Sequence, residues 1–399
     1  MLFRSVGALP LLGSLAVGLG VPAAIMSLAW PPVALALLLF SIPFSNWTKV
    51  TFGEFSITST DVLVAVLLVG WIARAVPDRQ LAIRGGPSLT AAIALLAAAF
   101  LSTLTAVDLP DAIKELIKLC ELIGVGFFAA TNLASPSAAR VTVWLISAAA
   151  ASEALVGLGQ FVTGSGPESF AIGPFIRAYG NFEQPNALAG YLGLAFPFAL
   201  IVALQRSRAQ LLGLVGAIII LAAIGASLSR GAWLGIALGL VAMGLAWDRS
   251  GRRWVLPGVA AIMVILLLAR AGLAPEALTA RLAVFFENFW VFDVRTVDTT
   301  PANWSLVERM AHWQAGWAIA VDNPVVGIGP GNWDKVYEDY YLPGWRESLG
   351  HAHNYYLNTL VELGAIGLAI FMVFVATIDR KSTRLNSSHI QKSRMPSSA

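Results

Sequence analysis

Residues 209–233 read AQLLGLVGAIIILAAIGASLSRGAW, and the first charged side chain in this stretch is Arg230. A helix needs about 20 predominantly apolar residues to cross the ~30 Å hydrocarbon core of a bilayer. The stretch is long enough to cross, and it must do so as a helix because lipid offers the backbone no hydrogen-bond partners. It therefore predicts a transmembrane helix that is followed directly by an arginine.

Uncharged stretches recur along nearly the whole chain, and the longest of them cover residues 5–48, 85–107 and 184–205. Shorter ones follow Asp61, Glu121, Arg140, Arg230, Arg253 and Leu363. Only 12% of the residues are charged and 57% are hydrophobic, whereas a soluble domain has about 25% charged residues. The strands of a membrane barrel would be half as long and would alternate in polarity. The sequence thus predicts an all-α, polytopic transmembrane helical bundle of about ten or eleven spans.

Basic residues concentrate in the short connections between the predicted spans, where acids occur only at Asp78, Asp248 and Asp379. The basic residues are Arg74, Arg79, Arg84, Arg140, Arg206, Arg208, Arg249, Arg252, Arg253, Arg380 and Lys381. An excess of Lys and Arg marks cytoplasmic connections. By helix parity, residues 272–352, with ten acids and five bases, fall on the other side. We expect them to form a large, mostly helical external loop domain.

These boundaries predict a transmembrane bundle over residues 1–271, the external domain over 272–352 and the last span over 353–378. Residues 379–399 contain six Ser and five Lys or Arg without apolar periodicity, so we expect a disordered, non-native tail. No small-residue cleavage site clearly ends the first apolar stretch, which favours a retained span over a removed signal peptide. Whether one or two spans precede residue 50 stays open, because prolines interrupt that stretch at Pro22, Pro31 and Pro32.

Two segments on the external side have irregular or glycine-rich sequences. The first is Arg177-Ala-Tyr-Gly-Asn-Phe-Glu-Gln-Pro-Asn186, and irregular backbone at membrane depth is tolerated only against protein or a water-filled cavity. We therefore expect Arg177 to lie near an external cavity. The second is Gly327-Ile-Gly-Pro-Gly331, which lacks the Lys-Ser/Thr pair of a phosphate-binding loop. Its glycines are expected to let the backbone pass close to a neighbour.

Residues 304–320 have helical spacing, with Arg309, His312, Trp313 and Gly316 on one face. A cation beside two rings suggests the wall of a groove. The sequence alone nevertheless favours a simpler interpretation of Arg309, in which it pairs with Glu308 or a neighbouring acid.

Arg230 and His353 both lie at predicted ends of spans, on the same side of the membrane as Arg309. Charged residues at membrane depth are functional candidates. For Arg230, a snorkelling helix end and a functional site are equally compatible with the sequence. For His353, a hydrogen-bonded interfacial residue is the commoner interpretation, and a catalytic residue is the alternative.

Lys114, Lys118 and Glu121 share one face of a predicted span. An internal ion-pair ladder is the favoured interpretation. The alternatives are a positive lining for an anionic headgroup and a proton relay in a transporter. Metal binding is not expected, because the one cysteine, Cys120, and the diverging side chains of His351 and His353 form no ligand set.

Several short strings in this order resemble the O-antigen ligase and polymerase family over roughly residues 60–378. They are Arg230-Gly-Ala-Trp233; Arg309 followed by His312-Trp313; Asn323-Pro324 followed by Gly327-Ile-Gly-Pro-Gly-Asn332; and His353-Asn354-x-x-Leu357 followed by Glu362-Leu-Gly364. Arg177 also matches a family string, Arg-x-x-Gly followed by Pro-Asn.

The resemblance implies a glycosyltransferase of lipopolysaccharide biosynthesis in the bacterial inner membrane, with its site facing the periplasm. It would move a glycan from undecaprenyl diphosphate to lipid A core, as a ligase, or to a growing polymer, as a polymerase. Arg230 and Arg309 would grip the diphosphate and His353 would contact the acceptor hydroxyl. Substrate-binding candidates are Arg177, Asn354, His312, Trp313, Lys114 and Lys118. Further spans would be expected where the polar tail begins.

General chemistry agrees with these roles. Negative charge grows on the diphosphate as a sugar leaves it, and fixed guanidinium forks stabilise that charge. A neutral histidine can take the proton of a sugar hydroxyl. No Asp-x-Asp pair occurs in the sequence, so we expect an inverting, metal-independent reaction without a cofactor or a nucleic-acid partner. The rival class is a transporter or flippase of a lipid-linked anionic solute, which would predict paired discontinuous helices and an internal repeat. The sequence has no evident repeat, and the large external domain favours the enzyme.

Overall fold

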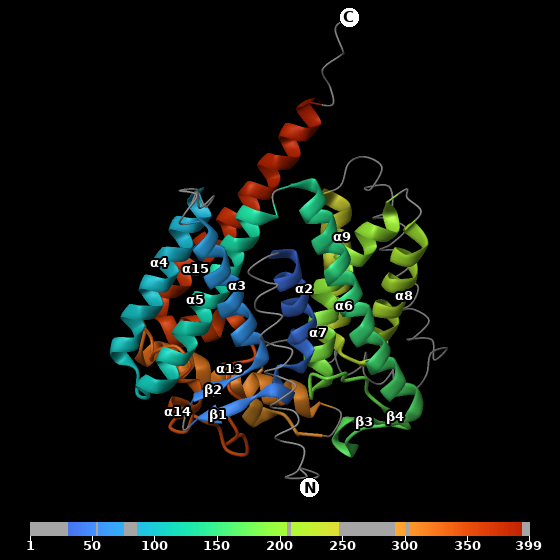
Figure 1. Ribbon diagram of the computed structural model, residues 1–399. Helices are drawn as coiled ribbons and strands as arrows, with labels where there is room; N and C mark the ends of the chain where they lie inside the picture. The colour runs from blue at the N-terminus through green and yellow to red at the C-terminus, as the bar shows by residue number, and fades with distance from the viewer. Residues whose placement is uncertain are drawn as a thin grey trace, which may run out of the picture. The chain divides into compact units, whose positions relative to one another are not determined.

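The computed structural model describes residues 31–52, 55–75, 86–133, 135–205, 209–246, 292–300 and 303–392. These residues are mainly helical, which confirms the predicted all-α class (Figure 1). The described strands form two short antiparallel hairpins: β1 (Val50–Phe52) pairs with β2 (Phe55–Ile57), and β3 (Ala171–Ile172) pairs with β4 (Phe175–Ile176). The chain divides into two compact units, of which unit 1 holds residues 1–81 and 132–287 and unit 2 holds residues 82–131 and 288–399.

Unit 1 is a bundle of apolar helices. They are α2 (Pro31–Ser41), α3 (Ser59–Ala75), α6 (Pro136–Thr163), α7 (Pro185–Leu204), α8 (Gln210–Ala226) and α9 (Arg230–Ala246). Helices α6, α7 and α8 pack against one another around Leu188, Leu192 and Ile220. A Cβ on Gly213 would lie 2.5 Å from the backbone nitrogen of Ala203. This glycine therefore allows the backbones of α7 and α8 to approach closely, as small residues do in membrane helices.

Unit 2 combines apolar helices with a polar segment of short helices and loops. Its elements are α4 (Gly86–Ser102), the 3₁₀ turn η3 (Thr103–Thr105), α5 (Leu109–Asn132), the 3₁₀ turn η5 (Val294–Thr296), α13 (Trp304–Asp322), α14 (Trp333–Tyr337) and α15 (Tyr355–Lys392). Helix α15 packs along α4, and α13 and α14 pack against α15. The core between them is built on Ile319, Ile328, Trp333, Tyr337 and Val361.

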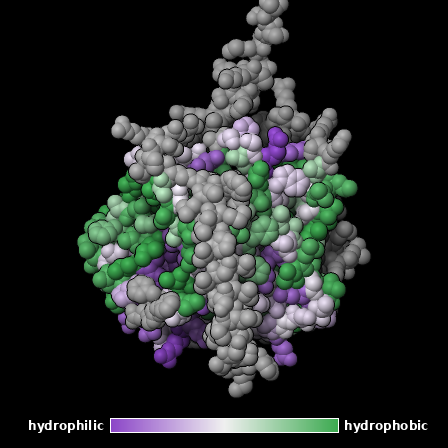
Figure 2. All heavy atoms as spheres, viewed as in Figure 1, coloured by the Kyte–Doolittle hydropathy of each residue, from purple (hydrophilic) through white to green (hydrophobic). Residues whose placement is uncertain are grey.

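Four described helices are long and apolar enough to cross a membrane: Gly86–Thr105, Pro136–Thr163, Pro185–Leu204 and Tyr355–Ile378. Four shorter apolar helices accompany them, at Ala34–Phe44, Ser59–Ala73, Gln210–Ala226 and Arg230–Leu245. Apolar side chains cover much of the visible helical surface (Figure 2), as expected of helices that face lipid. The chain is thus a multi-pass membrane protein. The total of ten or eleven spans stays a prediction, because residues 1–30 and 247–291 lie outside the described residues.

The last helix, α15, is broken at Gly364, whose backbone is non-helical (φ 67°, ψ −173°). The glycine turn over residues 327–331 docks at this break. The amide of Ile328 donates to the carbonyl of Val361 (3.0 Å), and the amide of Ala365 donates to the carbonyl of Pro324 (2.9 Å). A Cβ on Gly327 would collide with the carbonyl of Glu362. The predicted role of the turn's glycines, close approach to a neighbouring backbone, is therefore confirmed.

The polar tail differs from its prediction. Helix α15 continues to Lys392, so residues 379–392 are helical where the sequence predicted disorder. A membrane span supplies a helix nucleus, and each added residue then gains a hydrogen bond without a new nucleation cost. Residues 393–399 lie outside the described residues.

Candidate functional site

Arg177 in unit 1 joins two loops that are far apart in the sequence. Its Nε donates to the carbonyl of Ser227 (2.7 Å), and its Nη2 donates to Oδ1 of Asn186 (2.8 Å). Beside it, the amide of Ala178 donates to the carbonyl of Ala226 (3.0 Å). The guanidinium thus donates to two of the protein's own carbonyl groups, and these contacts fix the loop after Arg177 against the connection between α8 and α9.

The connection between α8 and α9 ends at Arg230. Leu228 has a positive φ of 50°, and the hydroxyl of Ser227 accepts a hydrogen bond from the amide of Ser229 (3.2 Å). Arg230 follows as the half-buried first residue of α9. The positive end of the helix dipole and the guanidinium lie together here, so the position favours an anion.

A buried carboxylate accepts hydrogen bonds from the loop that contains Arg177. Glu153, in the apolar helix α6, is only 2% exposed. It accepts hydrogen bonds from the backbone amide (2.5 Å) and the side-chain amide (2.9 Å) of Asn181. A Cβ on Gly180 would collide with the same carboxylate. The sequence interpretation missed Glu153, although a single acid in the apolar stretch after Arg140 was the available signal.

In unit 2, Arg309 lies half-buried on α13. Among the described residues, its guanidinium has neither a salt-bridge partner nor a hydrogen-bond acceptor. Burial lowers the pKa of Arg309, while the nearby charge of Glu308 raises it. An arginine keeps its proton at any physiological pH. The interpretation of Arg309 as one half of a salt bridge is therefore not supported.

His353 stands just before α15 in a strained conformation, with φ at 52°. Its Nε2 atom is buried and has no hydrogen-bond partner in the described part of the chain. Its ring lies 5.1 Å from that of His312 and 4.3 Å from that of His351, between centroids. Burial, followed by the positive charges of His351, His312 and Arg309, lowers the pKa of His353 to about 4. The imidazole is therefore neutral at pH 7 and can accept a proton.

His312 lies in the core and not at the wall of a groove. It is 1% exposed, and its ring stacks on Tyr337 with 5.0 Å between centroids. Its Nδ1 lies 2.7 Å from the carbonyl oxygen of Glu308, and its Nε2 lies 3.0 Å from that of Glu347. Because each ring nitrogen is hydrogen-bonded to a backbone carbonyl, neither nitrogen is available to a substrate. His312 instead supports the ring of His353.

Trp313, on the same helix, does line a groove. The groove has a volume of about 530 Å³ and is mainly apolar, and its other walls include Met310, Trp317, Tyr356 and Leu360. Asn354 lies at its end, but the Asn354 side-chain oxygen accepts from the amides of Tyr356 (3.1 Å) and Leu357 (3.2 Å). That oxygen caps α15, so only the amide nitrogen of Asn354 is left for its predicted role in substrate binding.

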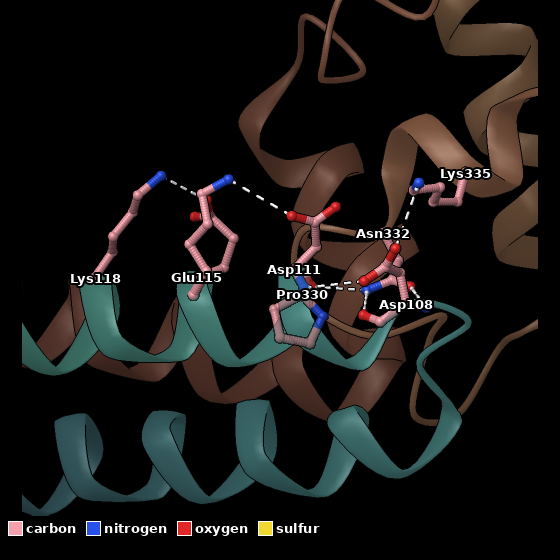
Figure 3. Close-up of polar contacts among 8 residues, drawn as sticks. Asp108, Asp111, Glu115, Lys118, Pro330, Asn332 and Lys335 are labelled. Carbon is pink, nitrogen blue, oxygen red and sulfur yellow. Dashed lines mark hydrogen bonds and ion pairs between the residues drawn. The ribbon is translucent and has the colours of Figure 1, made fainter. Parts of the chain in front are cut away.

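The two lysines of α5 form ion pairs with acids one turn earlier. Lys114 lies 3.5 Å from Asp111, and Lys118 lies 2.7 Å from Glu115 (Figure 3). The lysines thus pair with Asp111 and Glu115 at a partly exposed surface, where the sequence favoured an internal ladder with Glu121. Lys118 is exposed, so its assignment as a substrate ligand has no structural support.

The start of α5 is tied to the glycine turn by contacts that the sequence did not suggest. The amide of Asp108 donates to Oδ1 of Asn332 (2.6 Å), and Nδ2 of Asn332 donates back to the carbonyl of Asp108 (3.1 Å) (Figure 3). Lys335 lies 3.4 Å from the Asp108 carboxylate. The backbone amide of Asp111 and the charge of Lys335 lower the pKa of Asp108. These contacts fix the turn that follows α13.

The described residues thus bring the predicted site residues together in two pairs. Unit 1 places Arg177 and Arg230 on two loops joined by hydrogen bonds. Unit 2 places Arg309 one turn before His312 on α13, and the ring of His312 lies 5.1 Å from that of His353. That the two pairs form one site stays a prediction. Nowhere in the described ranges are three or more His, Cys, Asp or Glu residues grouped to hold a metal ion.

Comparisons with known proteins cover the segment that carries most of these residues. A family model described as O-Antigen ligase matches residues 215–372, a range that includes Arg230, Arg309 and His353. An O-antigen ligase of Salmonella typhimurium is 29% identical over 220 residues, which make up 52% of this chain and 48% of that protein. The chain therefore spans about half the length of the curated relative that it matches. Both findings confirm the resemblance that the motifs indicated.

Proposed function

We propose that this chain, which resembles O-antigen ligases over residues 215–372, transfers a glycan from undecaprenyl diphosphate to a hydroxyl of lipid A core. The observation that carries the proposal is the pair in unit 2. A half-buried guanidinium without an acceptor in the described residues lies near a neutral, buried imidazole whose Nε2 is unpartnered. The first group suits a diphosphate and the second suits a hydroxyl that must lose its proton.

Arg309 and Arg230 are the proposed donor ligands. Each planar guanidinium can bind two phosphate oxygens, and a fixed positive charge lowers the energy of the transition state because it needs no reorganisation when the sugar leaves. For Arg230, the start of α9 adds the positive end of a helix dipole. The positive charge for the leaving group thus comes from side chains, which is why we propose a metal-independent reaction.

His353 is the proposed general base. Its Nε2 takes the proton of the acceptor hydroxyl while the acceptor oxygen attacks the anomeric carbon of the donor sugar. The bond between that carbon and the diphosphate oxygen breaks, and undecaprenyl diphosphate leaves with the electron pair. One displacement of this kind inverts the anomeric configuration. The low pKa of His353, about 4, keeps its imidazole unprotonated at neutral pH, so that Nε2 can accept a proton.

The side and the membrane follow from charge and chemistry. The basic connections between the spans support a non-cytoplasmic location for the acid-rich segment over residues 272–352. The resemblance to O-antigen ligases supports a bacterial inner membrane, with the periplasm on that side. Arg309 lies within this segment and His353 directly follows it, so the proposed chemistry takes place there. An O-antigen polymerase would use the same donor and differ only in its acceptor.

A transporter or flippase of a lipid-linked anion is the candidate of another class. The break of α15 at Gly364 is one discontinuous helix of the kind that transporters use. The backbone groups at this break, however, are bonded to the turn over residues 324–329 and are thus not available to a solute. The glycosyltransferase is therefore the function that we prefer.

A detergent assay separates the two classes. Purified protein would be mixed with undecaprenyl-diphosphate-linked glycan and lipid A core, and the joined product would be measured by mass. We expect product from the wild-type protein and from Arg346→Ala, a control that removes an exposed arginine of unit 2, and no detectable product from Arg309→Ala. A wild-type protein that forms no product in detergent but moves the donor across vesicles would overturn the proposal in favour of transport.

A further inference from the structure

Unit 2 contains a cavity that the proposed chemistry has not used. It has a volume of about 390 Å³ and lies among α4, α5, the glycine turn and the first turns of α15. We name it the α4–α5–α15 cavity. Its polar lining includes Asp111, Glu115, Asp334, Asn358, Thr359 and Glu362. Apolar side chains from α4, α5 and α15 complete its walls, so it is mixed in character, unlike the apolar groove beside Trp313.

The charge of this lining excludes a phosphate. It holds four acids and one base, Lys114, whose nearest acid is Asp111 at 3.5 Å. Glu115 is paired with Lys118 at 2.7 Å. In the described ranges Asp334 has no salt-bridge partner, although its Oδ1 accepts a hydrogen bond from the hydroxyl of Ser348 (2.5 Å). The lining therefore carries a negative charge that no base within it neutralises. Like charges repel strongly at a site of low dielectric, which keeps the diphosphate of the donor away from this cavity and at the arginines.

The same lining suits a ring that bears hydroxyl groups. Ionised carboxylates only accept hydrogen bonds, and a sugar hydroxyl can donate to them. The hydroxyl of Thr359 and the amide of Asn358 add groups of both kinds. Apolar walls at Leu116 and Phe371 can cover the C–H face of a ring. A pocket with a few placed polar groups between apolar walls is the usual form of a small-molecule site.

Asn358 connects this cavity to His353. Its Oδ1 accepts a hydrogen bond from the amide of Ala352 (3.0 Å), the residue that precedes His353. On α15, Asn358 lies one turn before Glu362, and both residues line the cavity. Gly350, from the same loop as His353, forms part of the cavity wall. A ring held in the cavity would therefore lie next to the loop that presents the proposed base.

We propose that the α4–α5–α15 cavity binds the acceptor sugar, as an uncharged ring with free hydroxyls, and that Glu362 and Asp334 accept hydrogen bonds from it. The inference rests on the proposed function, which it extends by naming the acceptor subsite and its specificity. The arginines bind the anionic donor, and the carboxylates bind the neutral acceptor. A phosphate on the accepting sugar is rejected by the net negative lining.

Binding of the acceptor without any donor tests the subsite separately from the reaction. The ligand would be the core saccharide of lipid A core, with and without phosphate on its terminal sugars, titrated calorimetrically into detergent-purified protein. We expect Glu362→Gln to weaken binding of the phosphate-free saccharide by about 10-fold, since the amide offers one acceptor oxygen where the carboxyl group offers two. Glu338→Gln, at an exposed acid outside the lining, is the matched control and should bind as the wild type does.

Asp334→Asn provides a second variant with a test of opposite sign. Asp334 is exposed, so its replacement is not expected to prevent folding. It should weaken binding of the phosphate-free saccharide and strengthen binding of the phosphorylated one, because one repelling charge is gone. Binding of undecaprenyl diphosphate should be unchanged in both variants.

The outcomes separate the subsite from the function. If both variants bind the phosphate-free saccharide as tightly as the wild type does, the proposed acceptor subsite is wrong. Glycan transfer by the wild-type protein would still support the proposed function. Absence of transfer by the wild-type protein would overturn the function, and weaker saccharide binding in the variants would still uphold a sugar site here.

Discussion

Arg177 in unit 1 and Arg309 in unit 2 are the same residue type and are both expected on the external side of the membrane, yet their surroundings differ. The guanidinium of Arg177 donates to the carbonyl of Ser227 and to Asn186. The guanidinium of Arg309 has no acceptor among the described residues and is half-buried. The comparison shows that an arginine in a family motif can have a structural role or a ligand-binding role. Only its hydrogen-bond partners distinguish the two.

The comparison extends to the groups beside each arginine. In unit 1 the buried Glu153 accepts hydrogen bonds from both amides of Asn181, so this carboxylate needs no ligand. In unit 2 the Nε2 of His353 and the Nε1 of Trp313 are buried without partners in the described part of the chain. Buried polar groups are normally paired, so the exceptions mark unit 2 as the place where a ligand completes the structure.

The largest expected effect comes from the unpartnered imidazole. His353→Ala should lower kcat for glycan transfer by about 10²- to 10⁴-fold, the usual contribution of a general base. The thermal midpoint should change little, because Nε2 has no hydrogen bond to lose. Product formation in the detergent assay and a melting curve measure the two effects. A kcat within twofold of the wild type would assign the chemistry to another residue.

Replacement of each arginine by lysine tests the comparison directly. Arg309→Lys keeps the charge but loses the planar fork, so kcat/KM should fall by about 10- to 100-fold while the melting curve stays unchanged. Arg177→Lys should lower the stability by about 1 kcal/mol, with a smaller loss of activity, since it breaks a contact between two loops. If Arg177→Lys reduced transfer more than Arg309→Lys at unchanged stability, the two assignments would be exchanged.

The pH dependence of transfer should reflect the depressed pKa of His353. Protonation removes the base, and because that pKa is about 4, kcat/KM should stay constant from pH 8 to about pH 5. An unshifted histidine would already lose activity near pH 6.5. His351→Asn removes a positive neighbour that lowers the pKa of His353. In this variant the acid limb, the fall of kcat/KM at low pH, should therefore occur at a higher pH than in the wild type. A limb that stays in place would show that His351 does not act on the base.

The smallest effect is expected at Lys118. Its pair with Glu115 is exposed, and exposed pairs contribute about 0.2–1 kcal/mol. Lys118→Ala should therefore lower the free energy of unfolding by about 1 kcal/mol or less. It should change donor affinity by about twofold or less. A large loss of donor affinity would restore its sequence-based assignment as a substrate ligand.

The sequence determined the helices, because the information needed is local. Uncharged stretches such as residues 85–107 and 209–229 exceed the length that a bilayer requires, and α4 and α8 occupy them. It also supplied His353, because titratable groups at span ends are rare, and Arg309, through its place in the ordered family strings. The helical extension of α15 to Lys392 was missed, because composition alone does not report the helix that precedes a polar tail.

Tertiary structure alone decided which candidates have partners. His312 was a candidate ligand by its helical face, yet two carbonyls occupy its nitrogens, and one of them belongs to Glu347, 35 residues away. Glu153 and Asn332 were missed for the same reason, since their partners Asn181 and Asp108 are distant in sequence. Hydropathy and helical periodicity depend on neighbours along the chain, and the sequence therefore determines them. Burial and hydrogen bonding depend on neighbours in space, so they are settled only when the helices pack.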